Sequence, residues 1–418
     1  MRYKNFLVIF ISFLISFLIC EFFLRLKPNI LSDKVIFNFP HGEVREEIFK
    51  KVFNIDKEKI EYLIDENGKK IPLYQNNIDW RAHEKDIEWG AKSIAFYKKG
   101  FCEPEIEKLI NQSDNLTNAI AVGDSFTYCY SLSHENSWPS MLGNLQNKIE
   151  TKVYNLGIKG QGPYQYNEIL KKYINKNTKY IFVGFYEGND LRDTLKYLDP
   201  KKKQNFNFKE IKDKSLRDYI SSFIKSSYLV NFVYAAGVNK IYHKIFGINK
   251  TKVNIQNLEY KYVNQGRVVN FNLENVDTDE LFYANKIYEL KNPENYLNDK
   301  YFQPLSNLKE TAEKFKSKIF LVYIPSSYNS FGDNIVFNNK KHKFLLSNFS
   351  KVQRKVLRIL CKKLDINFID TSDGIKDYNI SNPKILSHFP VNVHLTSNGH
   401  NLVKEIIINK LNKIPNLN

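Results

Sequence analysis

Cysteine is scarce in this chain, and the few cysteines lie far apart. The 418 residues include four, which form neither a Cys-x-x-Cys pair nor a cluster with histidine: Cys20, Cys102, Cys129 and Cys361. A cysteine-based metal site is therefore not expected. Cys20 belongs to an apolar N-terminal run, and the other three are an odd number for an exported domain. At least one of those three is expected to be a free thiol.

Acidic residues are too few to balance the basic ones, and motifs for nucleic acid are missing. Lys and Arg number 62 against 45 Asp and Glu, which gives a net charge of +17. The excess fits a lysine- and asparagine-rich surface in contact with water, and it also suits an anionic partner such as acidic glycan or lipid headgroups. No stretch resembles a nucleic-acid-binding motif, so nucleic acid is not expected as a partner.

Internal repeats and long low-complexity tracts are also missing, whereas aromatic residues are abundant. The chain has 26 Tyr and 31 Phe, and hydrophobic residues make up 43% of it. This composition argues against a disordered protein and predicts a sizeable packed core. The length suits one domain of about 250 residues with additional segments.

One long apolar run lies at the N-terminus, from Phe6 to Leu24, with Glu21 as a polar interruption near its end. A run of about 19 residues is enough to span a bilayer. No small-residue cleavage site follows, so residues 1–25 are expected to form an uncleaved signal-anchor with residues 6–24 in the membrane. We expect a single-pass protein with its globular part outside the cytoplasm, although the flanking basic residues alone do not fix this orientation. A buried core helix is the alternative.

Apolar strands and amphipathic helices alternate in most of the remaining chain. The pattern predicts strands over 119–122, 152–156, 180–185, 319–324 and 367–369, and helices over 125–147, 164–174, 344–364 and 398–411. Such alternation predicts an α/β domain with a mostly parallel sheet and helices on both faces. In such sheets the ligand lies at the carboxyl ends of the strands.

The same reading divides the chain into regions. Residues 26–115 have no clear period and are expected to be a membrane-proximal region, followed by the α/β domain over 116–412. The pattern breaks at about 194–304, which we interpret as an insertion near the active-site edge. Its amphipathic stretch over 220–238 is either a packed structural helix or part of a lid, a glycan-binding surface or a membrane-apposed helix.

Three residues suited to acyl-transfer chemistry come directly after predicted strands. Ser125 is the candidate nucleophile, since a serine hydroxyl at the sheet edge attacks once a base takes its proton; alone it also fits a helix N-cap. The side-chain amide of Asn189 and a backbone N–H at Gly160 are candidate donors to an oxyanion. Alone, both also fit ordinary turns.

His394 is the best candidate for the base, because it lies in a loop before the last helix. His388 is a weaker alternative, and His400 is expected to be structural. These three histidines lack the i, i+4 helical pairing typical of zinc sites, so no metal is expected. Glu187 and Asp190 resemble a glycosidase acid pair only superficially, because they lie three residues apart on one loop.

Taken together, these segments resemble the SGNH, or GDSL-type, hydrolase superfamily. Gly123-Asp124-Ser125 is similar to its first block, Gly160 to its second, Gly188-Asn189-Asp190 to its third and His394 to its last. The resemblance covers about 119–194 and 315–412. It implies a flavodoxin-like three-layer α/β/α fold without a cofactor. It also implies Ser125 as nucleophile, His394 as base, and an oxyanion hole made by the backbone N–H groups of Ser125 and Gly160 and the side chain of Asn189.

The sequence departs from that family at one position. The family usually has an aspartate two or three residues before the histidine, where this chain has Asn392 and Val391. Three explanations are open. Ser125 and His394 act as a dyad, with Asn392 or a backbone carbonyl orienting the ring; a carboxylate such as Asp370 or Asp373 fills the role; or the protein has lost catalysis and kept ligand binding.

The leading functional hypothesis is a serine esterase that acts through an acyl-enzyme on acylated cell-envelope carbohydrate or another ester. An N-terminal membrane segment before such a domain is similar to bacterial members associated with cell-surface polysaccharides. One alternative is therefore an O-acetyltransferase of polysaccharide biosynthesis, in which a sugar hydroxyl replaces water. Another is a non-catalytic scaffold or binding protein with partners in an envelope polysaccharide-assembly complex.

Overall fold

The computed structural model describes a large part of the chain and divides it into two compact units. One unit comprises Met1–Lys59 and Gln204–Ile255, and the other comprises Ile60–Lys203 and Gln256–Asn418. The described residues are 2–31, 35, 39, 44, 47–48, 51, 60–64, 70–74, 76–79, 95–98, 101–111, 117–143, 152–198, 226–233, 259–272, 278–337, 339–390 and 393–414.

The first unit contains the apolar N-terminal helix. Helix α1 (Arg2–Leu26) is followed by η1 (Pro28–Ile30), and α10 (Tyr228–Val233) belongs to the same unit. Asn5–Leu26 is 22 residues long with a mean hydropathy of 2.7, and only 11% of its most apolar window is buried. At about 1.5 Å per residue, a helix of this length matches the hydrocarbon thickness of a bilayer. By length and composition it is a candidate membrane span.

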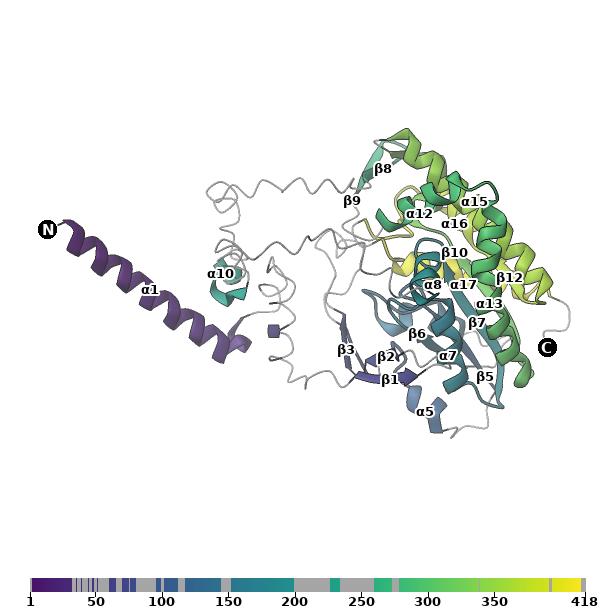
Figure 1. Ribbon diagram of the computed structural model, residues 1–418, viewed down its shortest axis with the longest axis horizontal. Coiled ribbons are helices and arrows are strands. Elements are labelled where there is room, and N and C mark those ends of the chain that lie inside the picture. The colour runs from purple at the N-terminus through teal and green to yellow at the C-terminus, as the bar shows by residue number, and fades with distance from the viewer. Residues whose placement is uncertain are drawn as a thin grey trace. The chain divides into compact units, whose positions relative to one another are not determined.

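A five-stranded sheet forms the centre of the second unit (Figure 1). Its strands are all parallel and lie in the order β12-β10-β7-β5-β6. They comprise β5 (Asn118–Gly123), β6 (Lys152–Gly157), β7 (Thr178–Tyr186), β10 (Lys318–Ile324) and β12 (Asn367–Asp370). Numbered along the chain, this is the flavodoxin-like order 2-1-3-4-5, so the expected sheet is confirmed.

Helices cover both faces of this sheet, because successive strand residues point into two different cores. On β7, for example, Val183 belongs to one core and Phe182 to the other. The first core is completed by α7 (Pro163–Tyr173), α13 (Pro293–Lys314) and α15 (Lys340–Lys363). The second is completed by α6 (Trp138–Gly143), α16 (Ser372–Ser381) and α17 (Ser397–Leu411). The three-layer α/β/α fold expected from the sequence is therefore confirmed.

Smaller elements surround the sheet. A second, antiparallel sheet has the order β11-β8-β9, and two antiparallel pairs join β1 to β2 and β3 to β4. The remaining elements are β1 (Ile60–Ile64), β2 (Lys70–Tyr74), β3 (Asn76–Asp79), β4 (Ala95–Lys98), α5 (Ile106–Asn111), η2 (His134–Asn136), α8 (Asp190–Leu198), β8 (Glu259–Asn264), β9 (Arg267–Asn272), α12 (Thr278–Glu289), α14 (Ser327–Ser330), η5 (Gly332–Asn334) and β11 (Ile335–Phe337).

Residues outside the expected segments of the α/β domain also pack into its first core. Phe101, Ile106 and Leu109 pack into the first core although they precede residue 116. Leu297 and Tyr301 of α13 pack there too, although they fall inside the expected insertion over 194–304. Local pattern alone does not show which amphipathic helix a core uses. Of the expected amphipathic stretch over 220–238, only residues 226–233 are described.

The segment after β5 is also different from the expected helix over 125–147. Residues 125–131 form turns, followed by η2 and α6. Side chains from elsewhere take the carbonyl groups that a helix uses: Trp138 Nε1 donates to the oxygen of Phe126, and Asn155 Nδ2 to that of Thr127. These tertiary hydrogen bonds outweigh the helical pattern, so Ser125 does not lie at a helix N-terminus.

Candidate active site

The sheet order brings the predicted site residues to one edge. Ser125 follows β5, Asn189 follows β7, and Gly160 follows β6. Strand β5 lies between β6 and β7, so these three loops leave neighbouring strands at their carboxyl ends. The chain changes direction across the sheet at β5, and such a switch point is where open parallel sheets bind ligands.

Ser125 and His394 are hydrogen-bonded. His394 Nε2 lies 2.9 Å from Ser125 Oγ, and each residue is 8% exposed, so the pair is nearly buried. A bridge between His388 and Leu395, and a hydrogen bond from Phe389 N to His394 O at 2.8 Å, close the loop that carries the imidazole. This is the geometry in which a histidine takes the proton of a nucleophilic serine.

Asn189 is oriented by a buried carboxylate. Its Nδ2 donates to Asp124 Oδ2 at 2.9 Å, and Asp124 Oδ1 accepts from Phe126 N at 2.9 Å. Burial raises the pKa of Asp124 to about 7, against the lowering effect of these two hydrogen bonds. An amide nitrogen carries two hydrogens, and among the described residues only Asp124 accepts from this one. The second N–H is left for another acceptor, and an oxyanion is an acceptor of this kind.

Gly160 adopts a backbone conformation that favours glycine. Its φ is +71°, and a Cβ built there meets nothing within 4 Å, so the constraint is conformational rather than steric. Ile158, two residues before Gly160, donates its N–H to Gly123 O at 2.9 Å. This bond ties the Gly160 loop to the end of β5, next to Ser125.

The two other histidines near the C-terminus serve the fold. His388 is fully buried, its Nδ1 lies 2.9 Å from Ser387 Oγ, and burial lowers its pKa to about 3. His400 accepts the N–H of Trp138 at 3.2 Å through Nδ1, and burial also lowers its pKa to about 3. Neither contacts Ser125 among the described residues, so His394 is the base that the geometry supports.

The carboxylates considered as partners for His394 are engaged elsewhere. Arg354 pairs with both of them: its Nε lies 2.8 Å from Asp370 Oδ2, and its Nη2 lies 3.1 Å from Asp373 Oδ2. The hypothesis that one of them orients His394 therefore loses its support. Asn392 and Val391 lie outside the described residues.

Glu187 and Asp190 do not form a catalytic acid pair. Both side chains are fully buried. Ser326 Oγ donates to Glu187 Oε1 at 3.1 Å, while Tyr166 Oη and Tyr186 N donate to Asp190 at 2.6 and 3.0 Å. These contacts fix the turn after β7 that carries Asn189, which is a structural role.

Two aromatic side chains at the site were not anticipated from the sequence. The imidazole of His394 stacks against Tyr130, with centroids 3.9 Å apart, and against Phe126, with centroids 4.7 Å apart. Both come from the turns after Ser125. The aromatic residues that follow Ser125 in the sequence are the only local indication of these contacts, and the same pattern is also typical of one face of a helix.

The comparisons with known proteins give structural similarity only. No family model and no curated protein matches the chain. A solved member of the lipolytic protein G-D-S-L family from Veillonella parvula is 12% identical, with a TM-score of 0.35 over 71% of this chain and 99% of that one. An extracellular lipase from Streptomyces rimosus is 12% identical, with a TM-score of 0.38 over 70% and 99%. A catalytic mutant of an acetylxylan esterase from Geobacillus stearothermophilus is 10% identical, with a TM-score of 0.35 over 71% and 94%. At these identities and TM-scores, the similarities do not assign a function to the chain.

Proposed function

We propose that this chain is a serine ester hydrolase that works through an acyl-enzyme. The observation that carries the proposal is the 2.9 Å contact between His394 Nε2 and Ser125 Oγ at the carboxyl edge of the sheet. His394 accepts the proton of Ser125 while Oγ bonds to the acyl carbon. The ester C–O bond then breaks, and His394 returns the proton to the leaving alcohol. Water repeats the sequence on the acyl-enzyme and releases the acid.

Asn189 supplies the electrophilic part of this mechanism. Its second amide N–H, together with the backbone N–H groups of Ser125 and Gly160, stabilises the negative oxygen of the tetrahedral intermediate. Because Asp124 already fixes the amide, little reorganisation is needed when the charge forms. Preorganised donors of this kind are worth most in a site that is largely shielded from water, as this one is.

The substrate we propose is acylated carbohydrate at the cell envelope, with the second unit outside the cytoplasm. Two observations support this location. Helix α1 is long and apolar enough to anchor the chain, and Cys102 and Cys129 form a disulfide, which is typical of oxidising compartments. Cys361 is the buried free thiol expected from the cysteine count.

Acyl transfer to a sugar hydroxyl uses the same residues, with the sugar in place of water. The two reactions are distinguished by their products. Acetylated sugar that forms from an aryl acetate and an oligosaccharide acceptor indicates transfer, whereas acetate alone indicates hydrolysis. Catalytic inactivity of the folded protein in both assays would favour the binding or scaffold role instead.

The test is hydrolysis of p-nitrophenyl acetate by the full-length protein in detergent micelles. We expect Ser125→Ala and His394→Ala each to abolish turnover. Ser381→Ala is the matched control, because Ser381 is an exposed serine of α16 whose Oγ donates to Asp377 O at 2.9 Å. Turnover that survives in both site variants, or that is lost equally in Ser381→Ala, would contradict the assigned site.

A further inference from the structure

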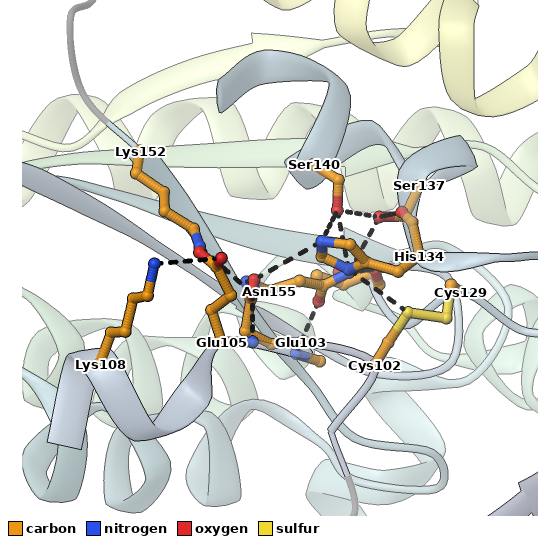
Figure 2. Close-up of polar contacts among 12 residues, drawn as sticks. Cys102, Glu103, Glu105, Lys108, Cys129, His134, Ser137, Ser140, Lys152 and Asn155 are labelled. Carbon is orange, nitrogen blue, oxygen red and sulfur yellow. Dashed lines mark hydrogen bonds and ion pairs between the residues drawn. A yellow bond between two sulfur atoms is a disulfide. The ribbon is translucent and has the colours of Figure 1, made fainter. Parts of the chain in front are cut away.

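The turns after Ser125 are fixed to the rest of the second unit by a network centred on Asn155 of β6 (Figure 2). Asn155 Nδ2 donates to Thr127 O at 2.9 Å and to Ser137 Oγ at 3.2 Å. Its backbone N–H donates to Glu103 Oε2 at 3.1 Å. One buried residue therefore connects the turns, the start of α6 and the segment before α5.

Glu103 anchors that last segment. Its side chain is fully buried and accepts from the backbone N–H of Glu105 at 3.1 Å as well as from Asn155. Lys152 Nζ, also on β6, lies 3.7 Å from Glu103 Oε1. A buried carboxylate with these partners holds its segment firmly, because loss of any of them leaves a buried charge poorly satisfied.

The neighbouring Cys102 is covalently joined to the turns through Cys129. The disulfide packs in a small buried cluster with Tyr128 and Tyr130. Directly after Tyr130, Ser131 has a φ of 59°, a conformation that non-glycine residues rarely adopt. Such backbone strain persists only where the surrounding structure fixes the chain, and here the disulfide and Asn155 do so.

The result of these constraints is the placement of Tyr130 against His394. The two rings lie 3.9 Å apart between centroids, with their planes inclined by 17°, and Tyr130 is 8% exposed. Stacking on one face of the imidazole restricts its rotation, and Nε2 must point at Ser125 Oγ for proton transfer. In the sequence, residues 391 and 392 offer no carboxylate for the same task.

We infer that Tyr130 is a positioning residue for His394, and that the Cys102–Cys129 disulfide, anchored to β6 through Glu103, holds Tyr130 in place. The inference rests on the proposed function, since it assigns a partner to the base of that reaction. The ring is the part of Tyr130 that matters, because it makes the stacked contact. A phenylalanine at this position keeps that contact, whereas a leucine fills the cluster without an aromatic face.

The test compares variants of the full-length protein in p-nitrophenyl acetate hydrolysis and in labelling of Ser125 by a fluorophosphonate. We expect Tyr130→Phe to stay within about twofold of the wild-type kcat, and Tyr130→Leu to lower kcat about tenfold with KM unchanged, since a misplaced base slows only the chemical step. The double variant Cys102→Ala/Cys129→Ala should show a loss of similar size. Cys20→Ala is its control, because Cys20 is an exposed free thiol outside the second unit.

Thermal unfolding of each variant separates positioning from folding. A Tyr130→Leu protein that is folded and has the wild-type kcat overturns the inference, and so does an effect confined to KM, which places Tyr130 on the substrate. If Tyr130→Leu does not fold, the double cysteine variant decides in the same way. Ser125→Ala and His394→Ala are run in parallel. If Ser125→Ala and His394→Ala retain activity, the proposed function fails together with this inference. If these two variants lose activity while Tyr130→Leu and the double cysteine variant keep the wild-type kcat, this inference alone fails.

Discussion

Asn189 and Asp124 are joined by a hydrogen bond of 2.9 Å between an amide nitrogen and a fully buried carboxylate oxygen. The bond connects the loop after β7 to the loop after β5 and fixes the direction of the amide. Asp124 accepts with both oxygens, since Phe126 N uses the other one. In the mechanism we propose, the Asp124 carboxylate orients the amide of Asn189 and takes no part in the chemistry.

Asp124→Asn is expected to lower kcat although the side chain keeps its size. Asparagine has one acceptor oxygen, so either Phe126 N or Asn189 Nδ2 meets an NH₂ group and loses its partner. We expect a fall of about 10-fold or more, approaching the 10²- to 10³-fold effect of losing an oxyanion donor. Steady-state kinetics check this result, and an unchanged kcat would show that Asn189 is oriented without Asp124.

Asn189→Ala removes the donor itself and is expected to cost about 10²- to 10³-fold in kcat. KM should change little, because the developing oxyanion exists only in the transition state. The double variant with Asp124→Asn should then be no slower than Asn189→Ala alone, since both act through one amide. Additive losses would mean that Asp124 acts on catalysis by another route.

The parallel sheet and the Ser125–His394 pair were predictable because their signals are local. A buried strand such as β7 is nearly continuous in apolar residues, and Ser125, Asn189 and His394 each lie in a short recognisable segment. Strand order then places them together, since parallel strands end at one edge.

Long-range contacts were not predictable in the same way. The sequence pattern over 125–131 predicts a helix, whereas in the fold the side chains of Trp138 and Asn155 donate hydrogen bonds to backbone carbonyl oxygens of these turns. The pairing of Cys102 with Cys129 rather than with Cys361 depends on which segments the fold brings together. The engagement of Asp370 by Arg354 depends likewise on how α15 lies beside β12.

Gly160→Ala is expected to impair catalysis without disrupting the core. A Cβ meets nothing within 4 Å, but φ of +71° costs about 1–2 kcal/mol for a residue with a side chain, so the loop and its N–H shift. Gly266→Ala, in the β8–β9 turn, is the matched control, because its φ is +80° and its Cβ is equally unobstructed. We expect similar small decreases in melting temperature for both variants but loss of kcat only for Gly160→Ala. Equal activity of the two variants would remove Gly160 from the oxyanion hole.

His400 is expected to make the fold sensitive to acid. Burial lowers its pKa from an ordinary value of about 6.5 to about 3, so between these values the unfolded chain binds a proton that the folded protein does not. The stability that His400 contributes is fully present above about pH 6.5 and is lost as the pH falls toward 3, by about 1.4 kcal/mol per pH unit at most.

His400→Gln retains an acceptor for Trp138 N and does not titrate, so its stability relative to wild type should improve steadily between pH 6.5 and 4.5. Urea denaturation at both pH values measures the difference. His342→Gln is the comparison, because His342 is only partly buried beside Asn339. Burial lowers the pKa of His342 in the same direction, and the weaker burial predicts a smaller change with pH. A relative stability of His400→Gln that does not change with pH would mean that His400 is protonated in the folded protein. The buried contact with Trp138 N would then need a different acceptor.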